Sequence, residues 1–353
     1  MSPVLASKPS ERVMPSESEI ISRVRNRARP GRGVIVGVGD DAAVIKVAGD
    51  KDLIACCDLM IEGVHFRAKW APPRLIGRKA LAACLSDVAA MGGVPRFAMI
   101  SIALPEKCSS AFIDELFSGL FELADAHAVS IVGGDTSSSR DWLFMDVSVL
   151  GECESGRAVA RRGARPGDVI YVTGSLGASA CGLRLLEDGF RLEASGDIEL
   201  PKDESDAARR QALMKHLVPE PQLKMGHAIG EAGLATAMID ISDGLSTDLW
   251  HILDESNCGA VVHAAALPIA ECVVSLGAAA DPVALALESG EEYELLFTSR
   301  PESERQLAEL ADGLGVRLTT IGEIVETRGL RLERNGALES LEPSGYEHLI
   351  SSS

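Results

Sequence analysis

Short apolar runs alternate along the chain with longer stretches in which apolar residues recur at helical spacing. Such alternation restricts the fold to α/β or α+β layers, and it recurs in both halves of the chain. Strands are predicted at 33–39, 42–47, 52–58, 96–103, 129–133, 142–151, within 163–174, and at 236–241, 259–264, 292–298, 316–324 and 329–334. Helices are predicted at 17–29, 74–91, 110–127, 207–217, 221–233, 244–256 and 302–314, with another starting in the glycine-rich segment after 174.

Three segments follow from this pattern: a flexible N-terminal tail at 1–16, an N-terminal domain at 17–151 and a C-terminal domain at 152–353. The tail lacks the apolar core of a signal peptide. Residues 190–210 are charged and aperiodic, which indicates a surface excursion, and Asn335–Gly336 predicts a tight turn.

Composition narrows the class of partner. The net charge is −18, which argues against nucleic acid, because that binding depends on lysine and arginine neutralising phosphates. No apolar run is long enough to cross a bilayer. The eight cysteines include no CxxC pair and no zinc-like Cys/His spacing, so we expect reduced thiols and a cytoplasmic protein.

Aspartates stand where hydrophobic runs stop. They are Asp40, Asp41, Asp58, Asp135, Asp240 and Asp243. Asp87 instead lies inside the helical stretch, on the apolar face of Ala80, Cys84 and Met91. Burying a bare carboxylate is costly, so seven such acids suggest a shared site for hard cations, which usually accompany phosphates in enzymes.

Each motif also has an ordinary structural interpretation. The glycines before Asp41 and Asp135 could simply form turns. Asp243 could cap the helix at 244–256. Arg161 and Arg162 could be surface charge, or they could reach phosphate oxygens.

Two further segments remain open in the same way. His65 could be a hydrogen-bonded structural residue, and the acidic run at 290–294 could be a solvated turn. The chain contains no GxxxxGK[ST] loop, no convincing dinucleotide fingerprint and no GxSxG elbow.

Taken in order, seven strings carry a resemblance. GVGDDAAVI, DLMIEGVHF, KALAACLSDVAAMGG, GGDTSSS, GARPGDVIYVTGSLG, IDISDGLSTDL and SGEEYELLFT resemble the thiamine-monophosphate kinase family from about residue 18 to the end. The wider superfamily includes aminoimidazole ribonucleotide synthetase, selenophosphate synthetase and the hydrogenase maturation protein HypE. The resemblance implies an N-terminal domain that binds ATP and Mg²⁺, and whose mixed sheet forms a barrel across a homodimer. A larger C-terminal α/β domain would close over ATP.

The resemblance also implies roles for individual residues. Magnesium ligands would be Asp41, Asp58, Asp87, Asp135, Asp240 and Asp243, with Asp40 supporting them and Cys57 at a position where the family commonly has a hydroxyl residue. Gly134, Asp135, Arg161 and Ser242 would contact ATP, and Asp41, Asp87, Asp135 and Arg161 would carry catalysis. Thiamine monophosphate would meet His65, Glu291 and the segment around Pro343, where an aromatic residue is usual and Tyr346 lies nearby. A further departure is Glu292 in place of the family's usual aspartate after the substrate acid.

The implied activity is ATP-dependent phosphorylation of thiamine monophosphate to thiamine diphosphate, with several Mg²⁺ ions. Two alternatives remain: another ATP-using enzyme of the superfamily, or a non-catalytic relative that binds nucleotide or metal. Against another superfamily enzyme, no reactive cysteine is evident in a glycine-rich N-terminal segment, and the chain ends Ile-Ser-Ser-Ser rather than in a modifiable cysteine. The retention of all seven acids counts against a non-catalytic relative.

Overall fold

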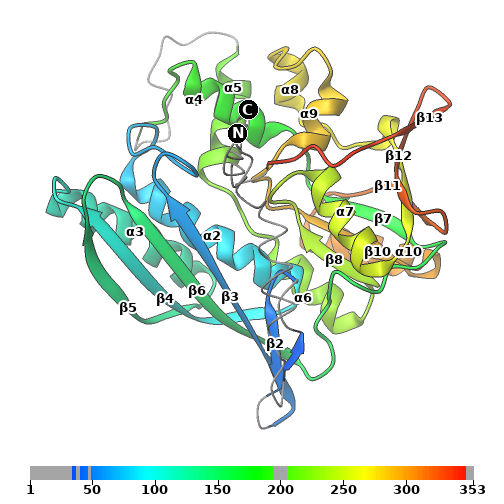
Figure 1. Cartoon of the computed structure of the whole chain (residues 1–353), viewed down its shortest axis with the longest axis horizontal. Coiled ribbons are helices and arrows are strands. Elements are labelled where there is room, and N and C mark those ends of the chain that lie inside the picture. Colours follow the sequence, from blue (N-terminus) through cyan, green and yellow to red (C-terminus); the bar gives the residue numbers. More distant parts are fainter. Residues whose placement is uncertain (1–33, 37–39, 47–48, 194–204, 347–353) are drawn as a thin grey trace, which may run out of the picture.

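Two β-sheets, one in each half of the chain, form the framework of the molecule (Figure 1). The structure is a computed structural model that describes residues 34–36, 40–46, 49–193 and 205–346. The expected tail at 1–16, the expected helix at 17–29, residues 37–39 and most of the expected surface excursion lie outside these ranges.

The N-terminal sheet is mixed. Its strands are β1 (Val34–Val36), β2 (Ala43–Lys46), β3 (Lys51–Ile61), β4 (Val94–Pro105), β5 (Ser130–Ser139) and β6 (Phe144–Glu154). They lie in the order β1-β2-β3-β6-β4-β5, and all neighbours are antiparallel except β4 and β5.

Two helices, α2 (Pro73–Ala90) and α3 (Ser110–Ala126), pack on one face of this sheet (Figure 1). Side chains alternate along each strand, so Ile54, Ile100 and Val147 are buried beneath the helices. Leu59 and Phe97 belong to the opposite set and are exposed by 49% and 46%. The sheet therefore has one covered face and one apolar face that is open among the residues that the structure describes.

The C-terminal sheet has seven strands. They are β7 (Val169–Thr173), β8 (Ala237–Asp240), β9 (Gly259–His263), β10 (Leu295–Ser299), β11 (Leu318–Val325), β12 (Gly329–Arg334) and β13 (Ala337–Ser340). The order is β13-β12-β9-β11-β7-β10-β8, in which β9 and β12 are parallel and the other pairs antiparallel. The accompanying helices are α4 (Ala178–Glu187), α5 (Asp206–Leu217), α6 (Leu223–Ala232), α7 (Leu245–Ser256), α8 (Glu271–Ser275), α9 (Pro282–Glu288) and α10 (Glu304–Leu314). Two 3₁₀ turns lie at Ala264–Ala266 and Pro301–Ser303.

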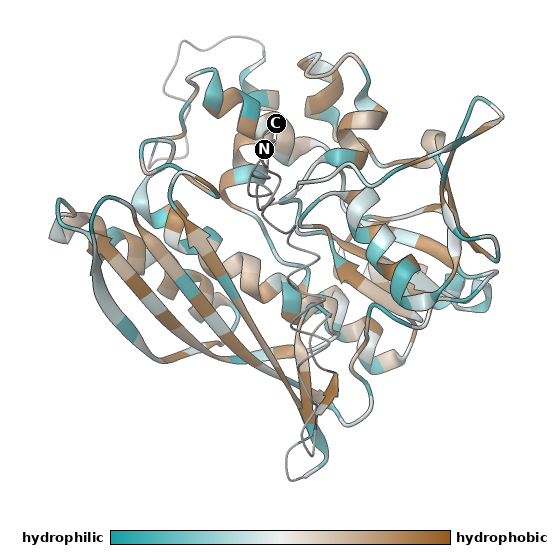
Figure 2. Cartoon of the chain, in the orientation of Figure 1, coloured by the Kyte–Doolittle hydropathy of each residue, from teal (hydrophilic) through white to brown (hydrophobic). Residues whose placement is uncertain are grey.

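A single hydrophobic core joins the two halves. It includes Val88 and Met91 at the end of α2, Met225 of α6 and Phe297 of β10. Figure 2 shows the apolar residues repeated along β3, β4 and β6. Because α2 contacts both the N-terminal sheet and α6 and β8 of the second half, it is the shared wall between them.

Several predicted boundaries are wrong. β3 continues to Ile61 and β5 to Ser139, so Asp58 and Asp135 lie inside strands rather than at strand ends. Both strands are extended by ladder pairing with β6 and β4, which local sequence does not reveal. The strand expected at 292–298 begins at Leu295, and α8, α9 and β13 were not predicted. The turn predicted at Asn335–Gly336 is confirmed, with both residues at positive φ between β12 and β13.

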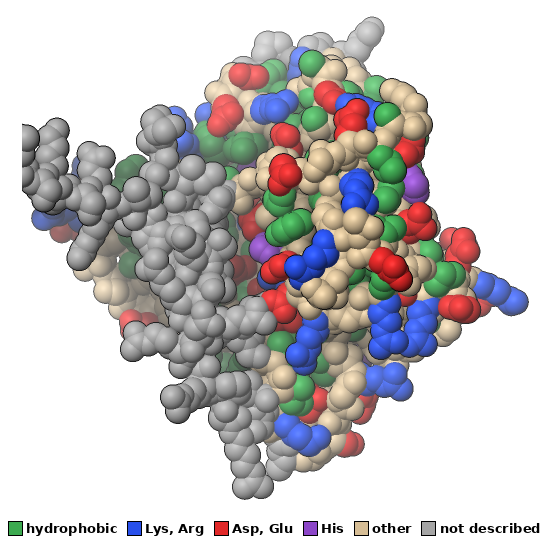
Figure 3. Space-filling model, turned by 45° about the vertical axis from the view of Figure 1, so that its right-hand side comes forward, with side chains coloured by type: hydrophobic (Ala, Val, Ile, Leu, Met, Phe, Trp, Pro, Cys, Tyr) green, Lys and Arg blue, Asp and Glu red, His purple; other side chains and the backbone are tan. Residues whose placement is uncertain are grey.

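No helix in the described ranges combines the length and apolar character needed to span a membrane. On the described part of the face shown in Figure 3, acidic and basic side chains are interspersed.

Candidate active site

Three aspartates from distant parts of the chain converge where the halves meet. Asp41 lies between β1 and β2, Asp87 is on α2, and Asp240 is the last residue of β8. One carboxylate oxygen from each lies within 4.8 Å of the other two. The structure therefore brings together three of the seven acids that the sequence singled out.

Burial makes these carboxylates hard to ionise. Burial first, and the Asp41 carboxylate second, raise the pKa of Asp240 to about 8. The same two causes raise the pKa of Asp40 to about 7. Burial raises the pKa of Asp87 well above its usual range, and Cys56, Asp58, Asp240 and Asp41 add to the rise.

Arg161 supplies positive charge to this group from the segment that links the two sheets. Its Nη2 and Nε donate to the two oxygens of Asp41 at 2.7 and 3.1 Å. Its backbone amide donates to both oxygens of Asp40, at 3.2 and 3.1 Å. Although burial disfavours the guanidinium charge, Asp41 raises the pKa of Arg161 above its ordinary value. Arg161 is therefore built into the site rather than being surface charge.

A divalent cation fits this arrangement. Carboxylate oxygens are the ligands that Mg²⁺ and Ca²⁺ prefer. One guanidinium cannot balance several neighbouring buried acids, and a hard cation would remove the repulsion that raises their pKa values.

Asp58 belongs to the same neighbourhood, whereas the side chain of Cys57 does not. Along β3, Cys56 faces α2, because its thiol donates to the carbonyl oxygen of Cys84 at 3.4 Å. Asp58 shares that face by alternation, and its charge adds to the raised pKa values of Asp87 and Asp240. Cys57 is exposed on the opposite face, so only its backbone carbonyl could serve the cluster.

The loop after Asp240 is held by a residue that the sequence reasoning missed. Asp248, in the first turn of α7, accepts the backbone amides of Ser242, Asp243 and Gly244 through one oxygen, at 3.0–3.2 Å. The cap residue of α7 is Gly244 rather than Asp243, so the capping alternative for Asp243 is wrong. The hydrogen bonds to Asp248 instead hold the loop, and they keep Ser242 and Asp243 next to the end of β8.

Gly134 and Asp135 lie apart from the three converging carboxylates. Both are exposed on β5, the last strand of the sheet order. Gly134 has φ +151°, and a Cβ there would stand 1.8 Å from the carbonyl oxygen of Ile100. The glycine is thus required by the close approach of β4, and the structure does not bring Asp135 into the three-carboxylate group.

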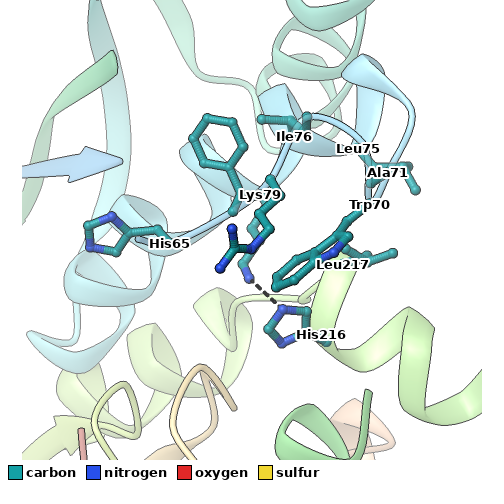
Figure 4. Close-up of a pocket in the computed structure, with 10 residues that line it drawn as sticks. His65, Trp70, Ala71, Leu75, Ile76, Lys79, His216 and Leu217 are labelled. Carbon is teal, nitrogen blue, oxygen red and sulfur yellow. Dashed lines mark hydrogen bonds between the residues drawn. The ribbon is translucent and has the colours of Figure 1, made fainter. Parts of the chain in front are cut away.

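A pocket between the N-terminal part of α2 and the end of α5 contains two further residues that the sequence reasoning missed, Lys79 and His216 (Figure 4). It is lined by His65, Phe66, Arg67, Trp70, Ala71, Leu75, Ile76, Lys79, His216 and Leu217. Lys79 is 3% exposed, and its Nζ lies 2.8 Å from Oε1 of Glu291 and 3.5 Å from Nε2 of His216. The available signal was weak: Lys79 follows Arg78 and directly precedes the apolar run at 80–85.

Burial and the Lys79 ammonium set the protonation states of Glu291 and His216 in this pocket. Burial opposes ionisation of Glu291, but Lys79 overcomes it and lowers the pKa of that carboxyl. Burial, and then Lys79, lower the pKa of His216 to about 3, which leaves the imidazole neutral at physiological pH. Nδ1 of His216 lies 3.1 Å from the hydroxyl of Ser179.

The acidic run at 290–294 is a buried structural element, so the solvated-turn interpretation is wrong. The amide of Glu291 donates to the carbonyl of Ser242 at 2.7 Å, and that of Tyr293 to Ile241 at 2.8 Å. Glu292 is fully buried and accepts the amides of Gly177 and Ser179 at the start of α4. The run therefore ties the pocket to the strand end that carries Asp240.

The segment around Pro343 packs against the loop after Asp240 and the start of α7. Pro343 itself is exposed. The next two amides donate to the hydroxyls of Ser246 and Thr247 at 3.2 and 2.9 Å, and the amide of Tyr346 donates to the carbonyl of Asp243 at 2.9 Å. The C-terminal segment is thus fastened to the start of α7.

Known proteins are similar to this chain in sequence and in overall fold. Residues 39–153 match the family AIR synthase related protein, N-terminal domain, and residues 165–335 match its C-terminal domain. The thiamine-monophosphate kinase of Escherichia coli K12 is 36% identical over 335 residues, covering 94% of this chain and 98% of that protein.

The chain belongs to the thiamine-monophosphate kinase family.

Solved structures of the family have the same architecture. The crystal structure of the kinase from Stenotrophomonas maltophilia K279a superposes with a TM-score of 0.74 at 34% identity, covering 91% of this chain and 98% of that one. The structure of AaThiL complexed with AMPPCP and TMP superposes with a TM-score of 0.80 at 28% identity, covering 98% of this chain and all of that one. This chain therefore spans both domains of the family.

Proposed function

We propose that the protein transfers the γ-phosphoryl group of ATP to thiamine monophosphate, producing thiamine diphosphate and ADP. The observation that carries this proposal is the convergence of Asp41, Asp87 and Asp240 beside Arg161. The family relationship supports the reaction, and a related protein binds AMPPCP and TMP together.

Magnesium is the cation that this reaction would use. Asp41, Asp87 and Asp240 would hold it, and Asp40, Asp58 and Asp243 would support them or hold further ions. Bound Mg²⁺ would neutralise charge on the triphosphate. The roles of Gly134, Asp135, Ser242 and the backbone of Cys57 remain predictions from the family resemblance.

The reaction asks little acid–base chemistry of the protein. The attacking atom is a phosphate oxygen of the acceptor, which is anionic at neutral pH. A P–O bond to that oxygen forms as the bond between the γ-phosphorus and the β–γ bridging oxygen breaks, and ADP leaves. Catalysis then depends on alignment and on neutralising charge in the transferred group. Arg161, fixed by Asp41, is placed to contribute a positive charge without having to reorganise.

The pocket of His65, Trp70, Lys79 and His216 is the proposed acceptor site. It joins apolar and aromatic walls to a few polar groups, as small-molecule sites do. Glu291 is the acid at its edge, and the amide of Glu291 is bonded to Ser242. This connection would hold the acceptor at a fixed position relative to the carboxylate group. Contact from the Pro343 segment remains a prediction.

A homodimer is the proposed assembly. The open face of the N-terminal sheet exposes Leu59, Phe97 and Met99. Contiguous exposed apolar surface of this kind marks protein–protein contact. A second copy placed on the same face would close the two sheets into a barrel. We also propose a cytoplasmic location, which the eight free cysteines support.

One assay tests the activity directly. Purified protein with ATP and Mg²⁺ should convert thiamine monophosphate to thiamine diphosphate with equal formation of ADP, and omission of Mg²⁺ should abolish the conversion. Free thiamine is the matched control and should not be phosphorylated. Binding of ATP without turnover of thiamine monophosphate would overturn the proposal in favour of a non-catalytic relative.

A further inference from the structure

Asp87 belongs to a second group of possible ligands besides the one shared with Asp41 and Asp240. The thiol sulfurs of Cys56 and Cys84 lie 3.3 Å apart. One oxygen of Asp87 and these two sulfurs all lie within 4.8 Å of one another. Asp87 is thus the carboxylate common to an all-oxygen group and to a group with two sulfurs.

The backbone makes this juxtaposition stable. Cys84 and Asp87 are three residues apart on α2, so they project from the same side of the helix. Cys56 projects from β3 toward that side, and the thiol of Cys84 donates to the carbonyl of Val147 at 3.2 Å. Neither thiol needs a backbone movement to reach the other.

The donor set selects a different class of cation from Mg²⁺. Thiolate ligands favour thiophilic metals such as Zn²⁺ and Cd²⁺, whereas Mg²⁺ takes oxygen ligands. A tetrahedral Zn²⁺ with Zn–S bonds of about 2.3 Å requires sulfurs about 3.8 Å apart. The observed 3.3 Å separation therefore needs only a small side-chain adjustment.

We propose that Cys56, Cys84 and Asp87 form a binding site for one thiophilic divalent cation. Two metal–sulfur bonds form as the two thiol protons pass to solvent, and one oxygen of Asp87 completes three protein ligands, with water as the fourth. Cys56 and Asp87 are only partly buried, which gives the ion a route of entry from the cluster side.

Asp87 belongs to both groups of ligands, so binding of a thiophilic cation should affect binding of Mg²⁺. A cation bound to the thiols draws on a carboxylate that the Mg²⁺ group also needs and places a second divalent charge beside it, so thiophilic metal and Mg²⁺ compete. If the proposed kinase function holds, micromolar Zn²⁺ or Cd²⁺ inhibits turnover and excess Mg²⁺ relieves the inhibition. This consequence rests on the proposed function, whereas the binding site does not.

Cadmium binding to the full-length, metal-free protein tests the site without reference to activity. The protein is kept reduced with a phosphine and titrated with Cd²⁺ while thiolate-to-cadmium charge-transfer absorbance is recorded. We expect one equivalent to bind with the intensity of two thiolates. Cys56→Ser and Cys84→Ser should each weaken this binding by at least about tenfold, and Asp87→Asn should weaken it while retaining the sulfur absorbance.

The chain supplies a matched control. Cys181 and Cys272 form a second hydrogen-bonded thiol pair, and within the described residues no metal-binding group includes them. Cys181→Ser should leave the Cd²⁺ titration unchanged, as should Cys57→Ser at the exposed neighbour. Circular dichroism verifies folding, and Cys56→Ser decides the question alone if Cys84→Ser does not fold.

Three results would overturn the proposal. They are retention of full Cd²⁺ affinity in Cys56→Ser, loss of the absorbance in Cys57→Ser or Cys181→Ser instead, and absence of stoichiometric binding by the reduced protein. Failure of thiamine monophosphate turnover would leave this titration unaffected, so the two proposals fail separately.

Discussion

At the scale of single residues, ionised carboxylates that are buried for metal binding lower the stability of the metal-free protein. Burial raises the folded-state pKa of Asp240 from 3.8 to about 8. Below about pH 4 the Asp240 carboxyl is protonated in both the folded and the unfolded state, so it does not affect the free energy of unfolding. Between about pH 4 and 8 it ionises only in the unfolded state, which lowers the free energy of unfolding progressively, and above pH 8 the loss is complete. Without metal, the protein should lose stability across that window.

Replacing Asp240 separates these two roles. In metal-free protein at pH 8.5, Asp240→Asn should be more stable than the parent by about 1 kcal/mol or more, and its Tm should rise by a few degrees. The difference should shrink at pH 5, where the parental carboxyl is protonated. Kinase turnover should fall by about 10²–10³-fold, as for removal of one transition-state-stabilising group.

Thermal melts at both pH values, with and without Mg²⁺, provide the measurement. The exposed Asp125→Asn, on the outer side of α3, is the control and should change neither quantity. Equal destabilisation of Asp240→Asn at pH 5 and pH 8.5 would show that Asp240 has a structural role instead.

At the scale of elements, α2 is fixed by glycines that allow close helix contact. A Cβ at Gly119 of α3 would stand 1.8 Å from the carbonyl oxygen of Arg74, and one at Gly77 would stand 2.0 Å from that of Leu116. On the other side, a Cβ at Gly226 of α6 would stand 2.2 Å from the carbonyl oxygen of Ala89. Since α2 carries Lys79, Cys84 and Asp87, these contacts determine where three functional side chains lie.

Gly119→Ala should therefore destabilise the protein by about 1–3 kcal/mol, despite the better helix propensity of alanine, because the added methyl overpacks the crossing. Gly313→Ala in α10 is the matched control, since a Cβ there meets nothing within 4 Å, and it should stabilise by up to about 1 kcal/mol. Urea unfolding measures both. If both variants shift stability in the same direction, the contact at α2 and α3 is not tight in solution.

At the scale of the whole molecule, the open face of the N-terminal sheet predicts self-association. Phe97→Glu would place a charge on that face and should convert the proposed dimer to a monomer in size-exclusion chromatography with light scattering. Phe121→Glu changes a similarly exposed phenylalanine on α3 and should leave the dimer intact. A monomeric parent protein, or a Phe97→Glu variant that stays dimeric, would contradict this assembly.

The sequence predicted the elements of the fold better than their ends. The α/β layers in each half, α2 with its Gly92 stop and the turn at Asn335 followed from local patterns. The length of β5 did not, because ladder pairing with β4 extends it through polar residues. Asp135 was consequently expected at a strand end, although it lies within the strand.

The acids of the site could be predicted from the sequence, but the residues that hold or pair with the site's loops and side chains could not. Asp240 follows an apolar run, so its burial was foreseeable. The grip of Asp248 on three amides, the pairing of Lys79 with Glu291 and the burial of Glu292 depend on contacts between distant segments. No spacing in one sequence encodes those contacts.

The contacts of Arg161 restrict how the two domains can be exchanged during evolution. Its charge comes from the linker, its two carboxylate partners from the first domain, and the adjoining Asp240 from the second. Neither domain can be exchanged for that of a distant relative without also matching this junction. We therefore expect the two domains to change together, and a chimera that joins unrelated halves within residues 155–168 should lack both a working centre and the core that the two halves share.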